Sequence, residues 1–180
     1  IKKRTDRIER QAKSGDKSFL KEFNVLDSVV ESLNKGISVR LQSISVEDYK
    51  NYIKPLSLLT SKPVLYVCNI NENEISNQSS ELTKLIKFLE NEGSRVVVLA
   101  AKIEEEINEL ENYEDRKMFL DDLGLTDSGS TILIRETHKL LNLSTFYTAG
   151  QKEVKAWTFT NGSKAPAVAG IIHSDFEKGF

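Results

Sequence analysis

The sequence has little cysteine and no long hydrophobic run, and each shortage excludes a class of protein. A single cysteine, Cys68, among 180 residues rules out an internal disulfide framework and fits a reducing cytosol. No apolar run approaches the roughly 18 residues that a membrane-spanning helix needs, and the N-terminus carries nothing like a signal peptide. Internal repeats and low-complexity segments are lacking as well. These shortages lead us to expect a cytoplasmic protein with no membrane partner.

An excess of one charge is also lacking, because the formal net charge is only −2. This balance argues against a protein that is basic all over, but it allows a local basic patch. Residues 1–22 hold eight basic and four acidic side chains, whereas residues 104–122 hold nine acidic and two basic ones. The apolar share of 39% is low and the charged share of 29% is slightly high, so we expect long solvated helices beside a modest core.

The N-terminal part of the chain predicts a charged helical hairpin. Residues 2–13 are polar nearly all round, and Ile8 is their only large apolar side chain. Residues 17–34 place apolar side chains three and four positions apart, which makes one stripe along a helix that Gly36 closes. A glycine-containing turn at residues 14–16 joins the two helices. Such a hairpin is consistent with a spacer arm and with a binding arm, and we leave both interpretations open.

Two short runs in the middle of the chain predict a parallel βαβ unit. Residues 63–68 and 95–100 are apolar without alternation, which is typical of strands buried on both faces. An amphipathic helix lies between them and ends at Gly93, and a crossover of this kind joins parallel strands. Before this unit, residues 45–48 have the character of a capping box, and they open a short helix that Pro55 kinks or ends.

The last part of the chain changes from acidic helices to a β-rich segment. Residues 103–141 favour helices, and residues 145–148 and 154–160 predict a β-hairpin. A helix is expected over residues 167–180, after a proline suited to a helix start. Because these elements are too few to finish their domains and the chain begins with Ile1 rather than Met, we expect a fragment of a longer protein.

The sharpest candidate site is the Asn69-Ile70-Asn71-Glu72 loop, directly after the first predicted strand. Ligands of open α/β sheets bind beyond the carboxyl ends of the strands. An asparagine followed three positions later by an acid can hold a nucleotide base: the carboxylate accepts from N–H groups of the base, and the asparagine ties the neighbouring loop. Taken alone the pattern is weak, because Asn and Glu are also ordinary turn residues.

Other chemistry-bearing residues indicate no catalytic or metal site. The two histidines, His138 and His173, lie in different segments, and no Cys/His spacing supports a zinc site. We interpret His173, with Asp175 close by, as structural or interfacial. Cys68 lies within a predicted strand and is expected to be inert. Trp157 alternates with Phe159 on one strand face, which favours core packing over stacking on bases.

Several segments together resemble the YchF (EngD) family, the Obg-like ATPases among the translation-factor GTPases. Residues 62–72 read KPVLYVCNINE, like the base-recognition segment of that family. Residues 145–150 and 153–158 read TFYTAG and EVKAWT, and residues 165–180 read APAVAGIIHSDFEKGF, like the start of its TGS domain. The hairpin, including AKSGDK at residues 12–17, resembles the inserted coiled-coil domain. The resemblance covers essentially the whole chain in the family's order.

This resemblance implies an α/β fold class, with part of a P-loop GTPase-type parallel sheet. It implies three parts: a helical coiled-coil hairpin insert at 1–44, the C-terminal part of a nucleotide-binding (G) domain at 45–142, and the N-terminal part of a ubiquitin-like α+β TGS domain at 143–180. The intact protein would be a cytoplasmic, ribosome-associated NTPase that hydrolyses ATP and possibly GTP. The oligomeric state stays open.

The resemblance also assigns residues to purine recognition. Ordinary GTPases carry Asn-Lys-x-Asp at this loop, and here Asn69 is kept, Ile70 takes the lysine position and Glu72 the aspartate position. A longer carboxylate and an apolar side chain loosen guanine selection, since specificity depends on well-placed hydrogen bonds. The second nucleotide-facing loop would be residues 99–102, where Ala100 and Ala101 supply backbone N–H groups and small side chains.

One departure from the family decides what this chain can do alone. The sequence contains no G-x-x-x-x-G-K-[ST] motif and no following magnesium-binding acid, so phosphate positioning and its Mg²⁺ would lie in a missing N-terminal part. We therefore expect no hydrolysis by these residues alone, no catalytic residue among them and no metal ligands. The alternative is a non-enzymatic adaptor that presents the helical arm and the TGS domain to the ribosome or RNA, with basic side chains between residues 2 and 21 neutralising phosphates.

Overall fold

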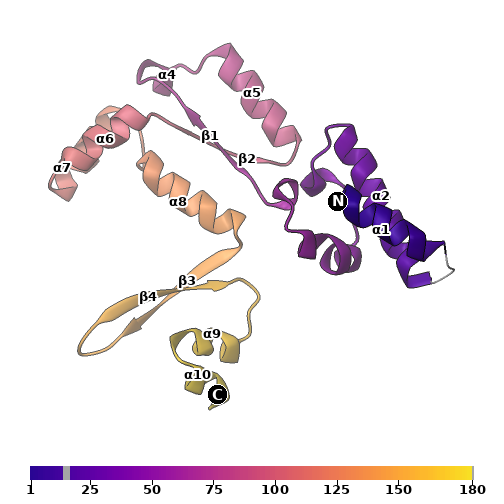
Figure 1. Ribbon diagram of the computed structural model, residues 1–180. Coiled ribbons are helices and arrows are strands. Elements are labelled where there is room, and N and C mark those ends of the chain that lie inside the picture. Colours follow the sequence, from indigo (N-terminus) through magenta and orange to yellow (C-terminus); the bar gives the residue numbers. More distant parts are fainter. Residues whose placement is uncertain (14–16, 180) are drawn as a thin grey trace. The chain divides into compact units, whose positions relative to one another are not determined.

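The computed structural model describes residues 1–13 and 17–179, and it divides the chain into two compact units after Pro63 (Figure 1). Across the described residues, no helix combines the length and the apolar character that crossing a bilayer requires.

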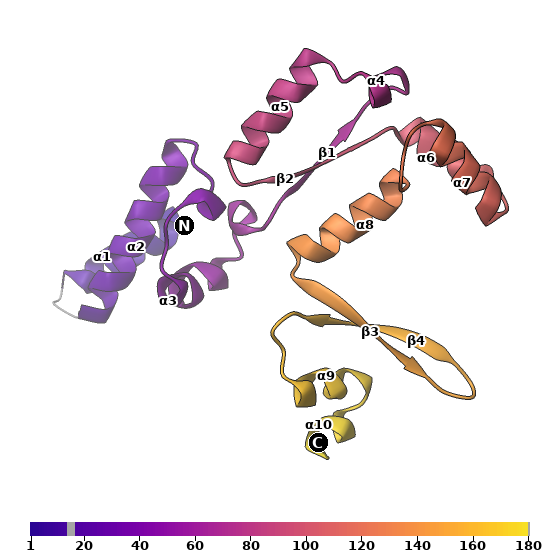
Figure 2. The ribbon, with the colours of Figure 1, turned by 180° about the vertical axis from the view of Figure 1, so that it is seen from behind.

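The first unit begins with two helices packed side by side, α1 (Lys2–Ala12) and α2 (Lys17–Asn34), as Figures 1 and 2 both show. Their predicted turn at residues 14–16 lies outside the described residues. Gly36 closes α2 in the left-handed conformation (φ 79°) that glycine adopts without steric cost, as the sequence predicted. An ion pair between Arg4 and Glu22 links the two helices.

The core of the first unit is formed by both helices and by the segment that follows them. This segment contains 3₁₀ turns at Val39–Leu41, Lys54–Leu56 and Leu59–Ser61, with a π-helical turn at Tyr49–Ile53. Five apolar side chains are buried together: Ile8, Leu26, Val29, Val39 and Ile53. Residues 45–63 thus pack with the helical hairpin, and the first compact unit ends at Pro63.

The short helix α3 (Val46–Asp48) begins as its capping box predicts. Ser45 Oγ accepts from the Asp48 N–H at 3.1 Å and also donates to the Asp48 carboxylate at 2.8 Å. Lys21 Nζ on α2 lies 2.8 Å from the same carboxylate. Hydrogen bonds from Lys21 and Ser45 hold the pKa of Asp48 below its usual range. Pro55 lies in a 3₁₀ turn further along, and Ser57 ends that turn in the left-handed region (φ 49°).

The second unit opens with the predicted parallel pair of strands, β1 (Leu65–Asn69) and β2 (Arg95–Leu99), in a register that sets Asn69 beside Leu99. Helices α4 (Asn73–Ser76) and α5 (Ser80–Asn91) form the crossover. The sequence predicted that both strands would be buried on both faces, but Val67 in β1 is 46% exposed. The physical reason is that both helices on this pair, α5 and α8, pack mainly against β2, which leaves a side chain of β1 exposed.

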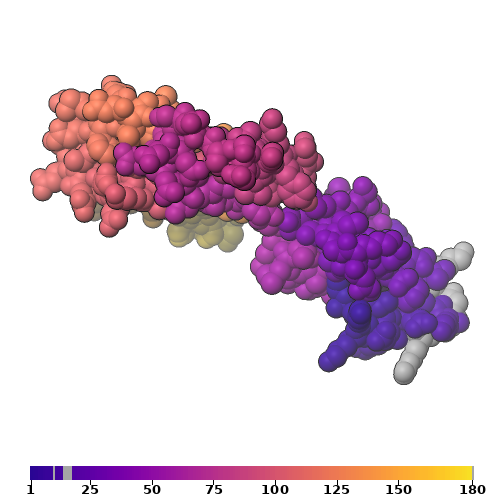
Figure 3. All heavy atoms as spheres, turned by 90° about the horizontal axis from the view of Figure 1, so that it is seen from above, coloured from indigo at the N-terminus to yellow at the C-terminus, as the bar shows by residue number. Residues whose placement is uncertain are grey.

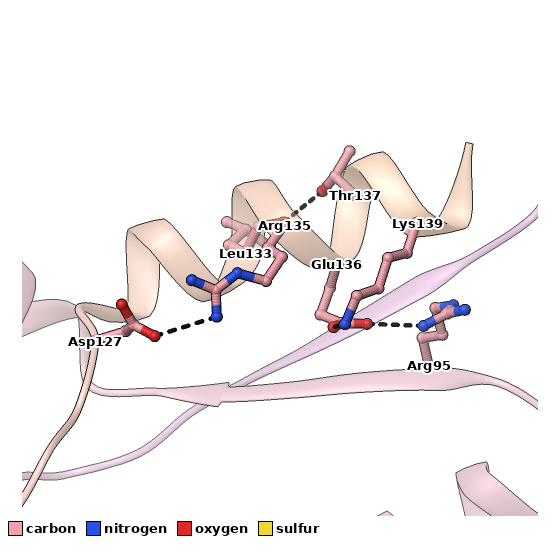
Figure 4. A network of polar contacts seen from close by, with 7 residues as sticks. All are labelled: Arg95, Asp127, Leu133, Arg135, Glu136, Thr137 and Lys139. Atoms are coloured by element: carbon pink, nitrogen blue, oxygen red, sulfur yellow. Dashed lines mark hydrogen bonds and ion pairs between the residues drawn. The ribbon is translucent and has the colours of Figure 1, made fainter. Parts of the chain in front are cut away.

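Helices α6 (Ala101–Glu109), α7 (Tyr113–Asp122) and α8 (Gly129–Leu140) follow β2, as the acidic segment predicted. Glu136 fixes α8 against the sheet, because Arg95 of β2 donates to its carboxylate at 2.8 Å (Figure 4). Lys139 donates to the other oxygen at 2.6 Å. These hydrogen bonds, from Lys139 first and then from Arg95, hold the pKa of Glu136 below its usual range.

The chain then forms the predicted hairpin from β3 (Leu143–Ala149) and β4 (Val154–Thr160), which pair antiparallel. Its half-buried face includes Trp157, whose Nε1–H donates to Thr148 Oγ1 at 2.9 Å, and Phe159, whose ring contacts that of Phe146. Both aromatic side chains are half-buried and contact neighbours on one face of this hairpin.

The helix expected over residues 167–180 is instead two helices, α9 (Ala165–Ile172) and α10 (Ser174–Lys178). The break is at His173, whose extended backbone (φ −161°, ψ 142°) ends α9. Its Nδ1 accepts from the Asp175 N–H at 3.2 Å and so caps α10, which is a structural role of the kind predicted. Phe180, the predicted end of the helix, lies outside the described residues.

Candidate functional site

The two candidate loops start next to each other, at the carboxyl ends of the parallel strands. The Ile70 N–H donates to the Leu99 carbonyl at 2.9 Å and continues the ladder between β1 and β2 by one bond. One position earlier, Asn69 Oδ1 accepts from the Ala101 N–H at 2.9 Å. This side chain therefore ties the end of β1 to the first residue of α6, which follows β2 after Ala100.

The two central residues of these loops face the protein interior. Ala100 is only 6% exposed and lies in a small apolar cluster with Ile103 and Ile107. Ile70 is half-buried and packs on the same cluster. Because its side chain supports the loop from below, Ile70 fills a packing position that a lysine could occupy only by directing its ammonium toward solvent.

Glu72 differs from its neighbours because it is exposed. It stands just before α4, and among the residues that the structure describes its carboxylate makes no hydrogen bond or ion pair. The adjacent Asn71 N–H donates to Glu74 at 3.3 Å, which fixes the loop backbone close to it. The carboxylate of Glu72 is therefore available to accept hydrogen bonds from a ligand.

A cavity of about 120 Å³ lies beneath the loops. Ile70, Ala100 and Ile103 form part of an apolar lining, and Glu104 and Asp127 contribute carboxylates. The residues around position 70 and the helices α6 to α8 adjoin one another at this end of the unit, as Figure 3 shows in magenta, salmon and orange. The wall is thus apolar inside, with acidic groups toward the beginning of α8.

Glu104 makes a contact that the sequence reasoning missed. Its two carboxylate oxygens accept from the backbone N–H groups of Gly129 and Ser130, at 2.6 and 2.9 Å. In the first turn of a helix such N–H groups have no backbone partner within the helix. In α8 Ser128 caps a third one by accepting from the Thr131 N–H. A signal was present in the sequence, since a serine cap and a glycine at the first helical position mark a helix start that another side chain can approach.

The segment around this helix start has the glycine spacing of a phosphate-binding loop without its lysine. Gly124 and Gly129 stand five positions apart, but Ser130 follows where a P-loop has lysine. Two of the N–H groups there are already bound to Glu104, an anion supplied by the protein itself. Across the described residues, no group of three or more His, Cys, Asp and Glu side chains is arranged to hold a metal ion.

Comparison with known proteins finds relatives along the whole chain. Residues 143–180 match the family profile YchF-GTPase_C, which is described as a protein of unknown function (DUF933). The chain is 44% identical over 182 residues to "Ribosome-binding ATPase YchF" of Bacillus subtilis (strain 168), and 42% identical over 174 residues to the protein of the same name from Escherichia coli O157:H7. These matches cover 100% and 97% of the chain.

A solved structure of a YchF protein has the same fold as this chain. The chain superimposes on the structure of the Schizosaccharomyces pombe YchF GTPase with a TM-score of 0.81 and 26% sequence identity, over 99% of this chain and 50% of that one. The chain also spans about half the length of the curated relatives it matches, 49% and 47% for the two bacterial proteins. The similarity is therefore to one contiguous half of these proteins.

Proposed function

We propose, because this chain belongs to the YchF family, that it supplies the base-recognition part of a nucleotide-binding ATPase that associates with ribosomes in the cytoplasm. The observation that supports this most directly is the hydrogen bond from the Ala101 N–H to Asn69 Oδ1. It joins the loops after β1 and β2 where ligands of α/β sheets bind. A purine base held between these loops is the function that the geometry favours.

Each site residue has a proposed task that follows from its place. Glu72, exposed and unpaired among the described residues, accepts hydrogen bonds from the amino group or ring N–H of the base. Asn69 positions the loops, and Ile70 and Ala100 hold them from the apolar cluster below. Ala101 contributes shape rather than a free donor, because its N–H is already bound to Asn69. This refines the expectation that both alanines would offer N–H groups to the nucleotide.

The proposed loop chemistry favours ATP over strict GTP use. A glutamate carboxylate extends one methylene beyond an aspartate, so its oxygens cannot take the place that grips guanine in an Asn-Lys-x-Asp loop. Guanine offers two adjacent donors, the N1–H and the 2-amino group, whereas adenine offers one exocyclic amino group. Loss of the paired contact reduces discrimination by a factor of about 10 to 1,000, the range for one to three hydrogen-bond energies.

The test is a comparison of ATP and GTP analogues bound to the intact protein. The double variant Glu72→Asp with Ile70→Lys restores the guanine-selective pattern, and we expect its preference to move toward GTP. Glu81→Asp is the matched control, since Glu81 is exposed on α5 and does not line the cavity beneath the loops. An unchanged preference in the double variant would contradict the assigned roles.

Phosphate binding and Mg²⁺ are proposed to belong to a P-loop segment outside these 180 residues. The complete coding sequence tests this directly, because it must contain G-x-x-x-x-G-K-[ST] upstream. The chain by itself is then expected to bind a nucleotide only weakly and to hydrolyse none. A complete protein without that motif would end the ATPase proposal and leave the adaptor as the better account.

The ribosome and RNA are the proposed macromolecular partners, and exposed basic side chains support this part. Lys2, Lys3 and Arg7 are exposed on α1. In strand β4, Lys155 Nζ lies 4.0 Å from the centroid of the Trp157 ring. We propose that residues 1–44 are the coiled-coil insert, 45–142 part of the G domain and 143–180 the start of a TGS domain. Co-sedimentation with ribosomes should weaken as salt increases, and a lack of binding at low salt would contradict the proposal.

A further inference from the structure

The carboxylate of Glu104 joins two helices, α6 and α8, at the edge of the proposed base site. It lies on α6, and it binds the Gly129 and Ser130 N–H groups at the start of α8. A charged acceptor on backbone donors makes a short, strong hydrogen bond, and the positive end of the helix dipole adds to the attraction. Glu104 thereby ties α6 to α8 across 25 residues of sequence.

The junction leaves no space for a side chain at its centre. A Cβ atom at Gly129 would lie 2.7 Å from Leu99 Cβ and 2.9 Å from Glu104 Oε1. Both distances are well inside van der Waals contact. The first turn of α8 therefore approaches the end of β2 and the Glu104 carboxylate so closely that only glycine fits at position 129. The position of the loop after β2 therefore depends on how closely α8 approaches Glu104.

The first turn of α6 has a second tie, to the last residue of β1. Ala101, the first residue of α6, donates to Asn69, and Glu104 follows less than one helical turn later. Helix α6 is thus held on one side by Asn69 and on the other by the start of α8. A change at either tie moves the short backbone segment between them, which carries the second proposed nucleotide-facing loop.

We propose that Glu104 is a positioning residue for the base site, which sets the Asn69–Ala101 contact by holding α6 against α8. The proposal rests on the proposed function, because it assigns a residue to the site that nucleotides would occupy. Glu104 touches no base in this account. It acts through the backbone of α6, and its loss is expected to weaken nucleotide binding without slowing the chemistry of the phosphate groups.

Glu104→Gln in the intact protein tests this inference. Glutamine keeps the size of the side chain but turns one acceptor into an NH₂ group that faces a backbone N–H. We expect the KM for ATP to rise about three- to tenfold with kcat unchanged, because one charge-assisted hydrogen bond is lost and binding alone is affected. Glu105→Gln is the matched control, an exposed glutamate at the next position of the same helix, and should leave both constants unchanged.

Hydrogen exchange gives a second readout that does not need the ATPase activity. The Ala101 amide should exchange faster in Glu104→Gln than in Glu105→Gln, together with those of Gly129 and Ser130. Should Glu104→Gln fail to fold by circular dichroism, Glu104→Asp provides the same comparison, since its shorter carboxylate cannot reach both donors.

The outcomes separate this inference from the function it builds on. A wild-type protein that binds no ATP would overturn the proposed function, while faster Ala101 exchange in Glu104→Gln would still support the positioning role. A wild-type protein that binds ATP, with equal KM and equal Ala101 exchange in the Glu104→Gln and Glu105→Gln variants, would overturn the positioning role alone. Faster exchange at Gly129 and Ser130 only, with Ala101 unchanged, would overturn it as well, because it would make Glu104 a cap of α8 and no more.

Discussion

Different interactions stabilise the interior of each of the two units. The first buries apolar side chains from α1, α2 and the segment that follows them, and Leu26 and Ile53 have no exposed surface at all. Around the candidate site of the second unit, the buried cluster is Ala100, Ile103 and Ile107, and polar ties complete it. Burial of apolar side chains stabilises a fold strongly but does not depend on direction, whereas a hydrogen bond contributes less and fixes the distance between two atoms. A binding site depends on such fixed distances.

The largest expected effect is in the apolar core of the first unit. Leu26→Ala should lower the free energy of unfolding by about 2–5 kcal/mol, because it removes a fully buried side chain and leaves a cavity. Thermal or urea unfolding measures this, with the exposed Leu20→Ala as the control on the same helix. Equal effects of the two substitutions would show that the core is not as closed as the comparison requires.

The next effect is at the contact between β2 and α8 in the second unit. Gly129→Ala should destabilise this unit by about 1–3 kcal/mol, because the added methyl group overlaps Leu99 and the Glu104 carboxylate. Gly150→Ala is the control, since the nearest atom to a Cβ there is at 3.8 Å, an ordinary contact. Chemical unfolding followed by the fluorescence of the half-buried Trp157 should separate the two variants. Equal stability of the two variants would contradict the close contact between β2 and α8.

A smaller effect is expected at the tie between the loops. Asn69→Ala should cost about 1 kcal/mol or less in stability, because the side chain is exposed and loses one hydrogen bond. Its effect on binding should be clearer, about a fivefold loss of ATP affinity in the intact protein by calorimetry. Asn108→Ala, an exposed asparagine on α6, is the control for the change of residue type. If Asn69→Ala caused a large loss of stability but left the ATP affinity unchanged, the hydrogen bond would serve the fold rather than the site, which would contradict the comparison.

The smallest effect is a pH dependence in the first unit. Because Lys21 and Ser45 hold the pKa of Asp48 below its value of 3.8 in the unfolded chain, the ionised form stabilises the fold. This contribution is present above pH 3.8 and is lost as the pH falls through the lowered folded-state pKa. Asp48→Asn should flatten the part of the melting temperature profile that lies below pH 3.8. Asp27→Asn, exposed on α2, should keep the wild-type slope.

Sequence patterns predicted the elements that are determined locally. Apolar spacing located α2, the lack of alternation located β1 and β2, and turn residues located the hairpin, because each depends on neighbours within a few positions. The break at His173 was missed because a single side chain that caps the next helix outweighs helix propensity there.

The candidate site was predictable only in part, for the same reason. Asn69 and Glu72 stand beside a strand end that the sequence locates, so their neighbourhood could be inferred. The partner of Glu104 lies 25 residues away along the chain, and nothing local distinguishes it from Glu105 or Glu106. Contacts between elements depend on packing in three dimensions, and one sequence holds no record of which acidic side chain makes them.

One measurement tests most directly whether the loops after β1 and β2 act as a single base site. Backbone amide NMR of the intact protein, titrated with ATP and in a separate experiment with inorganic triphosphate, identifies the signals that respond to the base. We predict shifts at Ile70, Glu72 and Ala101 that appear only with ATP, and smaller shifts at Gly129 and Ser130. Base-dependent shifts that leave both Glu72 and Ala101 unchanged would contradict the account.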